Sequence, residues 1–556
     1  MLTVTRLVTT LCGMCFRDAI GPQPFSRAAV TAALLAAACA RPAPESAPAP
    51  VPVPAGRTAA PVALAVERAE IPPPNPMLPP VPTVDGPLSI KVVYPDRGAV
   101  VASRDSNFIL GSIGNGRAGL RINGALVPVW PNGAFLGWIP NPPPDAQWYD
   151  LVAYTLTDTA RLRYPVRTLA GMPPRPPSSP DVTTFATPLA ATLRDDSLDR
   201  TVSDTDNVII GRPTPTGDYK WFLFPGTPVR LLEYRNDMAR VSLDGGQDIW
   251  VQRRVVKLSR ESQAAPMLRA GAAQLTPSVA SVDMDVRVSA PPAYVVNETE
   301  RAITVTLYNT SGPDSLQRTT DTLIADARVT REPNRMVYRF TLSRPVFGYQ
   351  VLYENGIFRI SVRRPPVVDP AAPLRGRTIV VDPGHPPIGA TGPTGLYEPV
   401  PTLAVGLKVR ELLEARGAHV VMTRVTPAPV ALGERPIIAR RADPDASVSI
   451  HLNADGDGQN PFRDNGTGTY YFHPQSKPLA RMIQDAMVPQ LGLRNRGVFY
   501  QNLAVCRPTW FPAVLAEGLF IIMPDQEAAI KTPQYQEAYA RGIVDGLEKY
   551  FASLAP

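Results

Sequence analysis

Histidine is rare in this sequence, and its positions point to metal chemistry. The chain has 556 residues but four histidines, all between residues 385 and 473. His385 follows one apolar segment that is typical of a strand, while His451 and Glu517 each close another. With Glu398, which precedes a helical pattern, they should meet beyond the carboxyl ends of parallel strands. Two histidines and one glutamate form a catalytic zinc set with a position open for water, and the other glutamate can act as general base.

The segments that must position these residues alternate in type. Apolar strand patterns and helical patterns with leucines on one face follow one another from Gly376 onward. This alternation predicts an α/β domain over residues 374–556, with a mostly parallel sheet flanked by helices. The expected strands cover residues 378–382, 419–423, 446–451, 468–472 and 513–517, and the expected helices cover 402–416, 432–442, 478–490 and 533–553.

Three further polar residues belong to the same part of the sequence, and two of them are candidates for supporting the site. Asp382 is expected to support its loop or to orient His385 from outside the ligand set. His473 follows a run of aromatic residues at a strand end, from which it could approach the cleft. His419 begins an interior strand and should point away from it.

The N-terminus resembles a bacterial lipoprotein signal. Arg17 and Arg27 precede an apolar run, 28–38, which has the length of a signal-peptide core and ends at Cys39. Cys39 would then be the lipidated first residue of the mature chain, and a plain signal cleaved near Ala38 or Ala40 is the alternative. Met14 is a candidate start, since it gives the leader an ordinary length.

Proline marks the boundaries between the remaining segments. Residues 40–84 contain 14 prolines and predict an extended, semi-rigid linker. Three small all-β domains should follow, which resemble in turn a β-sandwich, a bacterial Src-homology-type barrel and an AMIN-type amidase-targeting domain. They are expected over residues 85–170, 190–262 and 278–366, each with either a binding or a packing role.

Charge and hydropathy exclude two classes of function. The net charge is +7, from 56 basic and 49 acidic residues, and it is spread along the chain without a run of like charges. We therefore expect no nucleic acid as a partner. No apolar run reaches the ~18 residues of a membrane-spanning helix, which excludes a multi-pass membrane protein.

Four ordered motifs carry a specific family resemblance. Together they resemble the zinc-dependent N-acetylmuramoyl-L-alanine amidases of the type-three family, over about residues 374–556. The resemblance implies that His385, Glu398 and His451 hold zinc and that Glu517 is the catalytic glutamate. The motifs are Val380-Val-Asp-Pro-Gly-His385, Gly395-Leu-Tyr-Glu398, Val448-Ser-Ile-His-Leu-Asn-Ala454 and Pro512-Ala-Val-Leu-Ala-Glu-Gly518.

The chain departs from the family pattern around two of these motifs. Pro386 and Pro387 replace two glycines, Thr402 replaces an asparagine, and Pro399 and Pro401 replace ordinary residues. We expect these changes to stiffen the loop that holds Glu398 without removing a ligand.

The resemblance also implies a substrate and a location. The substrate would be peptidoglycan, cut between muramic acid and L-alanine in the cell envelope, with membrane attachment through Cys39. Residues 455–466 are too short and too polar for the blocking helix of some relatives, so no activator protein is expected to be required. The alternatives are a zinc peptidase acting on wall peptides and a non-catalytic wall-binding lipoprotein.

Overall fold

The computed structural model describes residues 66–169, 180–194, 209–259, 266–317 and 320–555. Cys39 and the expected signal segment lie outside these residues. Within the described ranges, no helix combines the length and the apolar character needed to cross a membrane.

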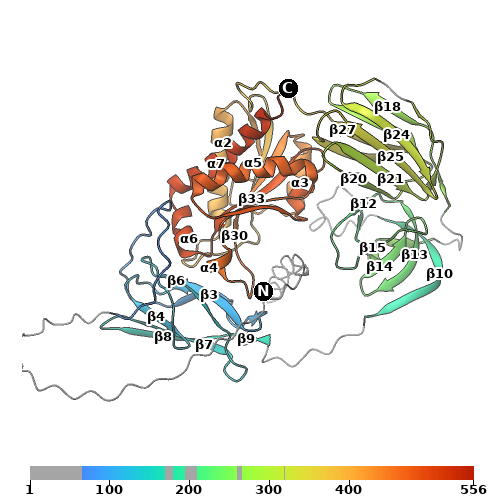
Figure 1. Cartoon of the computed structure of the whole chain (residues 1–556). Coiled ribbons are helices and arrows are strands. Elements are labelled where there is room, and N and C mark those ends of the chain that lie inside the picture. The colour runs from blue at the N-terminus through green and yellow to red at the C-terminus, as the bar shows by residue number, and fades with distance from the viewer. Residues whose placement is uncertain (1–65, 170–179, 195–208, 260–265, 318–319, 556) are drawn as a thin grey trace, which may run out of the picture.

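The C-terminal part of the chain is built on one six-stranded sheet, shown in the centre of Figure 1. Four of the neighbouring pairs are parallel, whereas β31 and β33 are antiparallel. The expected mostly parallel sheet is therefore a mixed one. In spatial order its strands are β29 (His419–Met422), β28 (Thr378–Pro383), β30 (Ala446–Asn453), β33 (Ala513–Phe520), β31 (Thr467–Tyr471) and β32 (Asn495–Tyr500).

Helices cover both faces of this sheet. On one face α2 (Pro399–Ala415), α5 (Lys477–Leu491) and α7 (Pro533–Ala552) pack on the alternate strand residues that share their core. On the other face α3 (Glu434–Arg441) contributes Ala439 to a smaller cluster with Val380. Two short helices, α4 (Pro461–Asp464) and α6 (Pro524–Ile530), follow the carboxyl ends of β30 and β33.

Local sequence signals set the helix ends. The Thr532 side chain accepts a hydrogen bond from the Tyr535 amide and so caps α7, and Gly492 ends α5 in the left-handed conformation at φ 65°. The expected start of α2 at Thr402 is wrong, because the helix begins at Pro399. Prolines are tolerated in a first turn, where the backbone N–H groups have no partner inside the helix.

The first β unit lies below the C-terminal domain in Figure 1 and has its own buried core. An Asn-Gly turn joins β4 to β5, with Asn123 and Gly124 at φ 48° and 82°, angles that these two residue types tolerate. Its strands are β1 (Lys91–Tyr94), β2 (Val100–Val101), β3 (Ser106–Ser112), β4 (Gly119–Ile122), β5 (Ala125–Leu126), β6 (Ala134–Pro140), β7 (Trp148–Tyr154), β8 (Thr159–Pro165) and β9 (Arg167–Thr168).

The second β unit has one five-stranded and one two-stranded sheet. It begins at Val182, earlier than expected, because β10 pairs along its length with β13. Its strands are β10 (Val182–Leu193), β11 (Ile209–Gly211), β12 (Trp221–Leu223), β13 (Pro228–Arg235), β14 (Met238–Ser242), β15 (Asp248–Gln252) and β16 (Val256–Leu258).

The third β unit shares one connected cluster of buried side chains with the second, so the two are not packed as independent domains. It begins at Leu268, before the expected boundary at 278. Its strands are β17 (Leu268–Arg269), β18 (Ala273–Pro277), β19 (Ser281–Arg287), β20 (Tyr294–Glu298), β21 (Ala302–Tyr308), β22 (Thr310–Ser311), β23 (Leu316–Gln317), β24 (Ile324–Glu332), β25 (Arg335–Leu342), β26 (Gly348–Glu354) and β27 (Ile357–Arg363).

Residues 66–84, the described part of the expected linker, lie against folded parts of the chain. Leu78 is 9% exposed and belongs to the same apolar cluster as the C-terminal domain. The Asn75 side chain donates to the Gly492 carbonyl at 2.7 Å. This segment is therefore packed rather than a free spacer, because its apolar side chains find a partner surface.

Candidate metal centre

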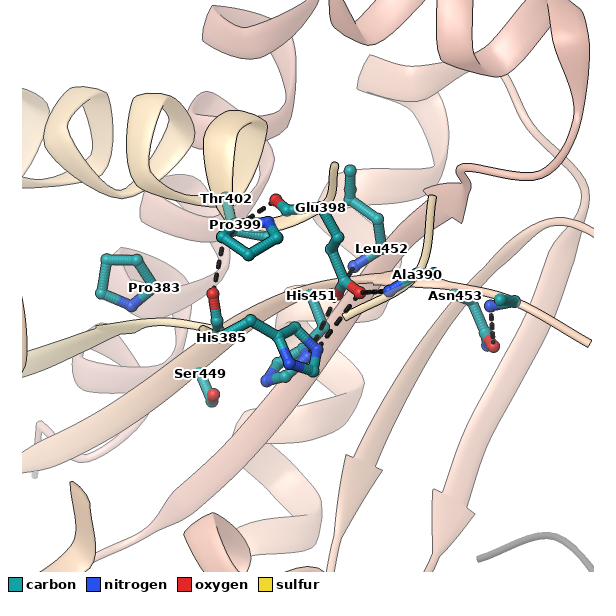
Figure 2. A network of polar contacts seen from close by, with 12 residues as sticks. Pro383, His385, Ala390, Glu398, Pro399, Thr402, Ser449, His451, Leu452 and Asn453 are labelled. Atoms are coloured by element: carbon teal, nitrogen blue, oxygen red, sulfur yellow. Dashed lines mark hydrogen bonds and ion pairs between the residues drawn. The ribbon is translucent and has the colours of Figure 1, made fainter. Parts of the chain in front are cut away.

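Two histidines and a glutamate point toward one another at the carboxyl edge of the sheet, as Figure 2 shows. Glu398 lies between the two rings, with Oε2 3.1 Å from His385 Nε2 and Oε1 3.3 Å from His451 Nδ1. The ring centroids are 4.7 Å apart. One ligand atom from each residue lies within 4.8 Å of those of the other two, so a single ion can contact all three side chains.

Main-chain donors hold Glu398 in place. The Ala390 amide donates to Oε2 and the Leu452 amide donates to Oε1, both at 2.9 Å. The residue is 3% exposed and immediately precedes α2, where the helix dipole favours a negative charge. Burial raises the pKa of Glu398, but His385 and His451 outweigh it and hold the pKa well below its ordinary value. The carboxylate is therefore ionised at neutral pH.

The loop that carries His385 is fixed by two buried arginines. Arg435 donates to the carbonyl oxygens of Pro383 at 2.8 Å and His385 at 3.0 Å, and Arg424 donates to those of Pro383 and Gly384 at 2.8 and 2.9 Å. His385 itself adopts φ 58°, a conformation that costs about 1–3 kcal/mol in a residue other than glycine. The arginines therefore hold the loop in a conformation that it would not adopt alone.

The Asp382 carboxylate is the counter-ion of the buried Arg435 guanidinium. Its carboxylate accepts hydrogen bonds from Arg435 Nη1 at 2.6 Å and from the hydroxyl groups of Thr423 and Ser449 at 2.5 and 2.6 Å. Burial raises its pKa, and Arg435 and the two hydroxyl groups outweigh that effect and lower it. Asp382 thus supports His385 through Arg435 and the backbone.

His451 is fixed by its close neighbours. A Cβ placed on Gly384 would lie 2.5 Å from the His451 ring, so only glycine allows this approach. The Tyr539 hydroxyl of α7 lies 2.8 Å from the Ala516 carbonyl oxygen and 3.1 Å from that of His451, and it ties β30 to β33. Burial lowers the pKa of His451 more than Glu398 raises it, which favours the neutral imidazole that a metal requires.

Glu517 joins the site from the neighbouring strand. It is the register partner of His451 in the parallel pairing of β30 and β33, so the two side chains lie on the same face of the sheet. Oε2 of Glu517 is buried and has no hydrogen-bond partner among the described residues. Burial first, and the charge of Glu398 second, raise the pKa of Glu517 well above its ordinary value, against the lowering effect of Arg496.

This donor set fits zinc. Catalytic zinc sites use three protein ligands of the imidazole and carboxylate types, and two histidines with one glutamate are such a set. The protonation states also fit, because Glu398 is ionised and the neutral form of His451 is favoured. The partnerless buried oxygen of Glu517 beside them is suited to hold a proton or a water molecule.

The structure does not bring His473 to this group. His473 is 7% exposed, and its Nδ1 and Nε2 lie 2.6 Å from Glu298 Oε1 and 2.9 Å from the Arg507 carbonyl oxygen. The expectation that it supports the site is wrong because β31 runs antiparallel to β33. Its carboxyl end therefore lies at the opposite edge of the sheet from Glu517. His419 is exposed at the start of β29 and is likewise outside the group.

Sequence reasoning missed residues that position the site from a distance. Glu527 of α6 is fully buried and accepts from the amides of Thr394 and Leu396 at 3.1 and 3.2 Å, which fixes the loop leading to Glu398. Arg435 ends the segment Leu432-Gly-Glu-Arg435, which agrees with the same family resemblance and was a usable signal for its importance. Glu527 and Tyr539 had no such signal, because the partners of each lie far away in the sequence.

A family model and several known proteins match the C-terminal domain. Residues 379–549 match the model described as N-acetylmuramoyl-L-alanine amidase. The chain is 36% identical over 185 residues to the probable cell wall amidase LytH of Staphylococcus epidermidis, and the match covers 33% of this chain and 60% of that protein. The LytH of Staphylococcus aureus is 37% identical over 186 residues, with the same coverage. The chain thus spans about 60% of the length of these curated relatives.

Solved structures match the same region. An N-acetylmuramoyl-L-alanine amidase from Clostridium difficile 630 is 32% identical, covers 32% of this chain and 97% of its own, and has a TM-score of 0.30. The catalytic domain of CwlV from Bacillus (Paenibacillus) polymyxa var. colistinus is 34% identical, covers 31% and 97%, and has a TM-score of 0.30. On the family match, residues 379–549 form an N-acetylmuramoyl-L-alanine amidase domain, and the curated relatives that match the same part of the chain are named as cell wall amidases.

Proposed function

We propose that this chain is a zinc-dependent amidase that hydrolyses peptidoglycan between N-acetylmuramic acid and the L-alanine of the stem peptide. The observation that carries the proposal is the meeting of His385, Glu398 and His451, with Glu517 paired to His451 on the adjacent strand. This group lies within the residues that match the amidase family.

The proposed roles follow from the chemistry of each side chain. His385, Glu398 and His451 would hold zinc, which, when bound, supplies an acidified water and polarises the scissile carbonyl. Glu517 accepts the proton of the attacking water and delivers it to the leaving nitrogen of L-alanine. Burial first, and the charge of Glu398 second, raise the pKa of Glu517 above its ordinary value, which favours uptake of this proton.

The surrounding residues keep this geometry rigid. Arg435 and Arg424 hold the backbone on either side of Gly384, and Glu527 holds the loop before Glu398. A displacement of about 1 Å in a reacting group costs on the order of 100-fold in rate, so such supports matter for turnover.

The proposal extends to location and partners. Cys39, at the end of the apolar run 28–38, would carry a lipid that anchors the chain at the extracytoplasmic face of a membrane after signal-peptide removal. Peptidoglycan is the proposed partner there, and nucleic acid is not. The extracytoplasmic location is supported by the relatives named as cell wall amidases.

We further propose that no activator protein is required. The stretch 455–466, between the second histidine of the site and Glu517, contains only the one-turn helix α4. Asp457 in this stretch is bound by the first β unit of the same chain. One similar solved structure, the CwlD amidase of Clostridioides difficile, is in complex with the GerS lipoprotein. It is 26% identical, covers 32% of this chain and has a TM-score of 0.29.

Digestion of purified sacculi tests the proposed reaction. The full chain, loaded with zinc and without added protein, should release intact stem peptides with a free L-alanine amino group, identified by mass spectrometry. Release of terminal amino acids instead would identify a peptidase. Absence of any product would contradict hydrolysis, and turnover only after addition of an envelope extract would contradict independence from an activator.

A further inference from the structure

Two buried carboxylate oxygens without a partner lie at the edge of the sheet that carries the metal centre. They are Oε2 of Glu517 on β33 and Oδ2 of Asp455, two residues after the end of β30, and neither has a hydrogen-bond partner among the described residues. A buried polar atom without a partner costs free energy and needs a physical reason. The proposed proton transfer accounts for the oxygen of Glu517 but not for that of Asp455.

One arginine acts on both carboxylates. Burial is the largest influence on the pKa of Glu517 and on that of Asp455 and raises both, whereas the charge of Arg496 lowers both. Among the described residues, Arg496 makes no ion pair. Its charge therefore reaches the two carboxylates without a direct salt bridge, and its N–H groups are committed to neither of them.

The pairing of the strands places Arg496 next to Glu517. Glu517 is the register partner of Gly468 on β31, and β31 pairs on its other side with β32, which carries Arg496. The register of β31 and β32 shifts at Gly468, where a Cβ would lie 3.9 Å from the Cβ of Arg496. Because glycine has no side chain, the long side chain of Arg496 has room to extend across β31 toward Glu517.

Two aromatic rings hold the guanidinium group of Arg496. Its carbon lies 4.9 Å from the centroid of the Phe520 ring and 5.5 Å from that of the Phe499 ring, within the range of a cation–π contact. Burial first and Glu517 second raise the pKa of the Tyr470 hydroxyl, and Arg496 lowers it, so this hydroxyl is a further neighbour. A guanidinium group has five N–H donors, so these contacts leave donors for a ligand.

The order of the strands gives the direction in which a substrate would cross this edge. His385 and His451 come from the ends of β28 and β30, Glu517 comes from β33, and these strands are neighbours in that order, with β31 and β32 beyond β33. Glu517 is proposed to give a proton to the leaving nitrogen. The leaving stem peptide should therefore lie on the far side of Glu517 from the two histidines, which is the side of Arg496.

The donors and acceptors at this place match the backbone of the leaving segment. The carbonyl oxygen of L-alanine accepts hydrogen bonds and suits Arg496, and the next amide N–H donates and suits the partnerless oxygen of Asp455. The two carboxylates beside the single arginine would repel a further negative charge. The match is therefore to neutral peptide groups and not to an acidic side chain.

We propose that Arg496 and Asp455 form the subsite for the first residue of the stem peptide, in which Arg496 donates to the L-alanine carbonyl and Asp455 accepts from the amide that follows it. This inference rests on the proposed amidase function and adds the residues that recognise the leaving group. Glu517 keeps the proton transfer, and the other two residues position the segment that departs.

A pair of substrates tests the inference on the full, zinc-loaded chain. They are N-acetylmuramoyl-L-alanine N-methylamide and the corresponding methyl ester, which differ only in the N–H that Asp455 should bind. The amide should be cleaved with a kcat/KM about 10–100-fold higher than that of the ester, because the ester lacks a hydrogen bond to a charged group. Mass spectrometry of the released N-acetylmuramic acid measures both rates.

Substitutions assign the preference to the two residues. Asp455→Ala should lower the kcat/KM of the amide at least about tenfold and leave that of the ester within about twofold, so the preference disappears. Arg496→Met should lower both values about tenfold, since both compounds carry the carbonyl, and Arg496→Lys should restore part of the loss. The controls Asp464→Ala and Arg463→Met, both exposed on α4, should match wild type.

Binding provides a readout that is separate from turnover. Titration calorimetry of the Glu517→Gln variant with each compound should show tighter binding of the amide than of the ester. Asp455→Ala on the same background should remove this difference. A merely structural role of Asp455 would weaken the binding of both compounds alike and would leave the difference in place, which contradicts the proposal.

Three results would overturn the inference. They are equal cleavage of amide and ester by wild type, an unchanged preference in Asp455→Ala, and digestion of sacculi by a chain that cleaves neither compound. Failure of the proposed function gives a different result, because the chain would then free no stem peptide from sacculi. The comparison of amide with ester uses the unaltered chain, so it decides the question even if a variant does not fold.

Discussion

His451 of β30 and Glu517 of β33 are register partners across two parallel strands. Side chains paired in this way lie side by side on one face, so the sheet itself sets the spacing between a proposed metal ligand and the proposed catalytic carboxylate. The Tyr539 hydroxyl contacts the carbonyl oxygens of His451 and Ala516 and keeps the two strands in this register. Metal binding is thus proposed for one residue of the pair, His451, and proton transfer for the other, Glu517. Substitutions can therefore test the two functions one at a time.

Glu517→Gln should lower turnover of sacculi by about 10²–10⁴-fold, because the amide cannot accept the proton of the attacking water. Metal content, measured by plasma mass spectrometry, should not change, since the three proposed ligands remain. Glu537→Gln, on the exposed side of α7, is the matched control and should behave as wild type. A loss of metal in the Glu517 variant would assign this residue to the ligand set instead.

His385→Ala should abolish stoichiometric zinc binding, because removal of one of three protein ligands leaves an incomplete site. Glu398→Gln should do the same, since the charge that balances the ion is lost. The control is His419→Ala, which changes an exposed histidine at the start of β29. Equal zinc content in all three variants, measured by equilibrium dialysis, would contradict the proposed ligands.

Arg435→Met should destabilise the C-terminal domain by about 3–5 kcal/mol, because it leaves the Asp382 carboxylate buried without its partner. It should also weaken zinc binding by about 10–100-fold, since the loop of His385 loses its support. Arg441→Met lies on the exposed side of the same helix and is the control. Thermal unfolding and zinc titration give the two readouts, and similar values for both variants would refute the role of Arg435.

Asp455→Asn should stabilise the fold above about pH 6. Burial raises the pKa of Asp455 from 3.8 to about 6, against the lowering effect of Arg496, and its Oδ2 has no hydrogen-bond partner among the described residues. From pH 3.8 to 6 the folded chain keeps a proton that the unfolded chain has released, so stability falls as pH rises. Above this range the buried charge costs its full amount, about 1–3 kcal/mol.

Unfolding midpoints of wild type and the Asp455 variant at pH 4 and pH 7.5 check this prediction. The gain should be present at pH 7.5 and nearly absent at pH 4. A gain of the same size at both values would show that the effect does not arise from ionisation of Asp455.

Asp457→Ala should loosen the first β unit from the C-terminal domain. The Asp457 carboxylate accepts from the Ala102 amide at 2.6 Å, from the Asn107 side chain at 2.7 Å and from the Tyr94 hydroxyl. Hydrogen bonds to charged groups contribute about 1.5–3 kcal/mol each. Limited proteolysis should therefore cut the first β unit of the variant faster, while Asp464→Ala, exposed at the end of α4, should leave the rate unchanged.

The residue pattern by itself determined the main features of the C-terminal domain. Alternating strand and helix periods placed every strand and main helix of the sheet except β32, and the expected helix 533–553 begins where α7 begins. The sequence also singled out His385, Glu398, His451 and Glu517. These features are accessible because they depend on local spacing and on one general rule, that the carboxyl ends of parallel strands meet at one edge.

Only the tertiary structure decided the features that depend on which strands and units become neighbours. The antiparallel direction of β31 took His473 to the far edge of the sheet, where Glu298 of the third β unit is its partner. The fully buried Glu527 acquired its role from Thr394, 133 positions away, and the Tyr539 hydroxyl acquired part of its role from His451, 88 positions away. Strand direction and long-range hydrogen bonds arise from packing across the whole chain, and no local pattern records them.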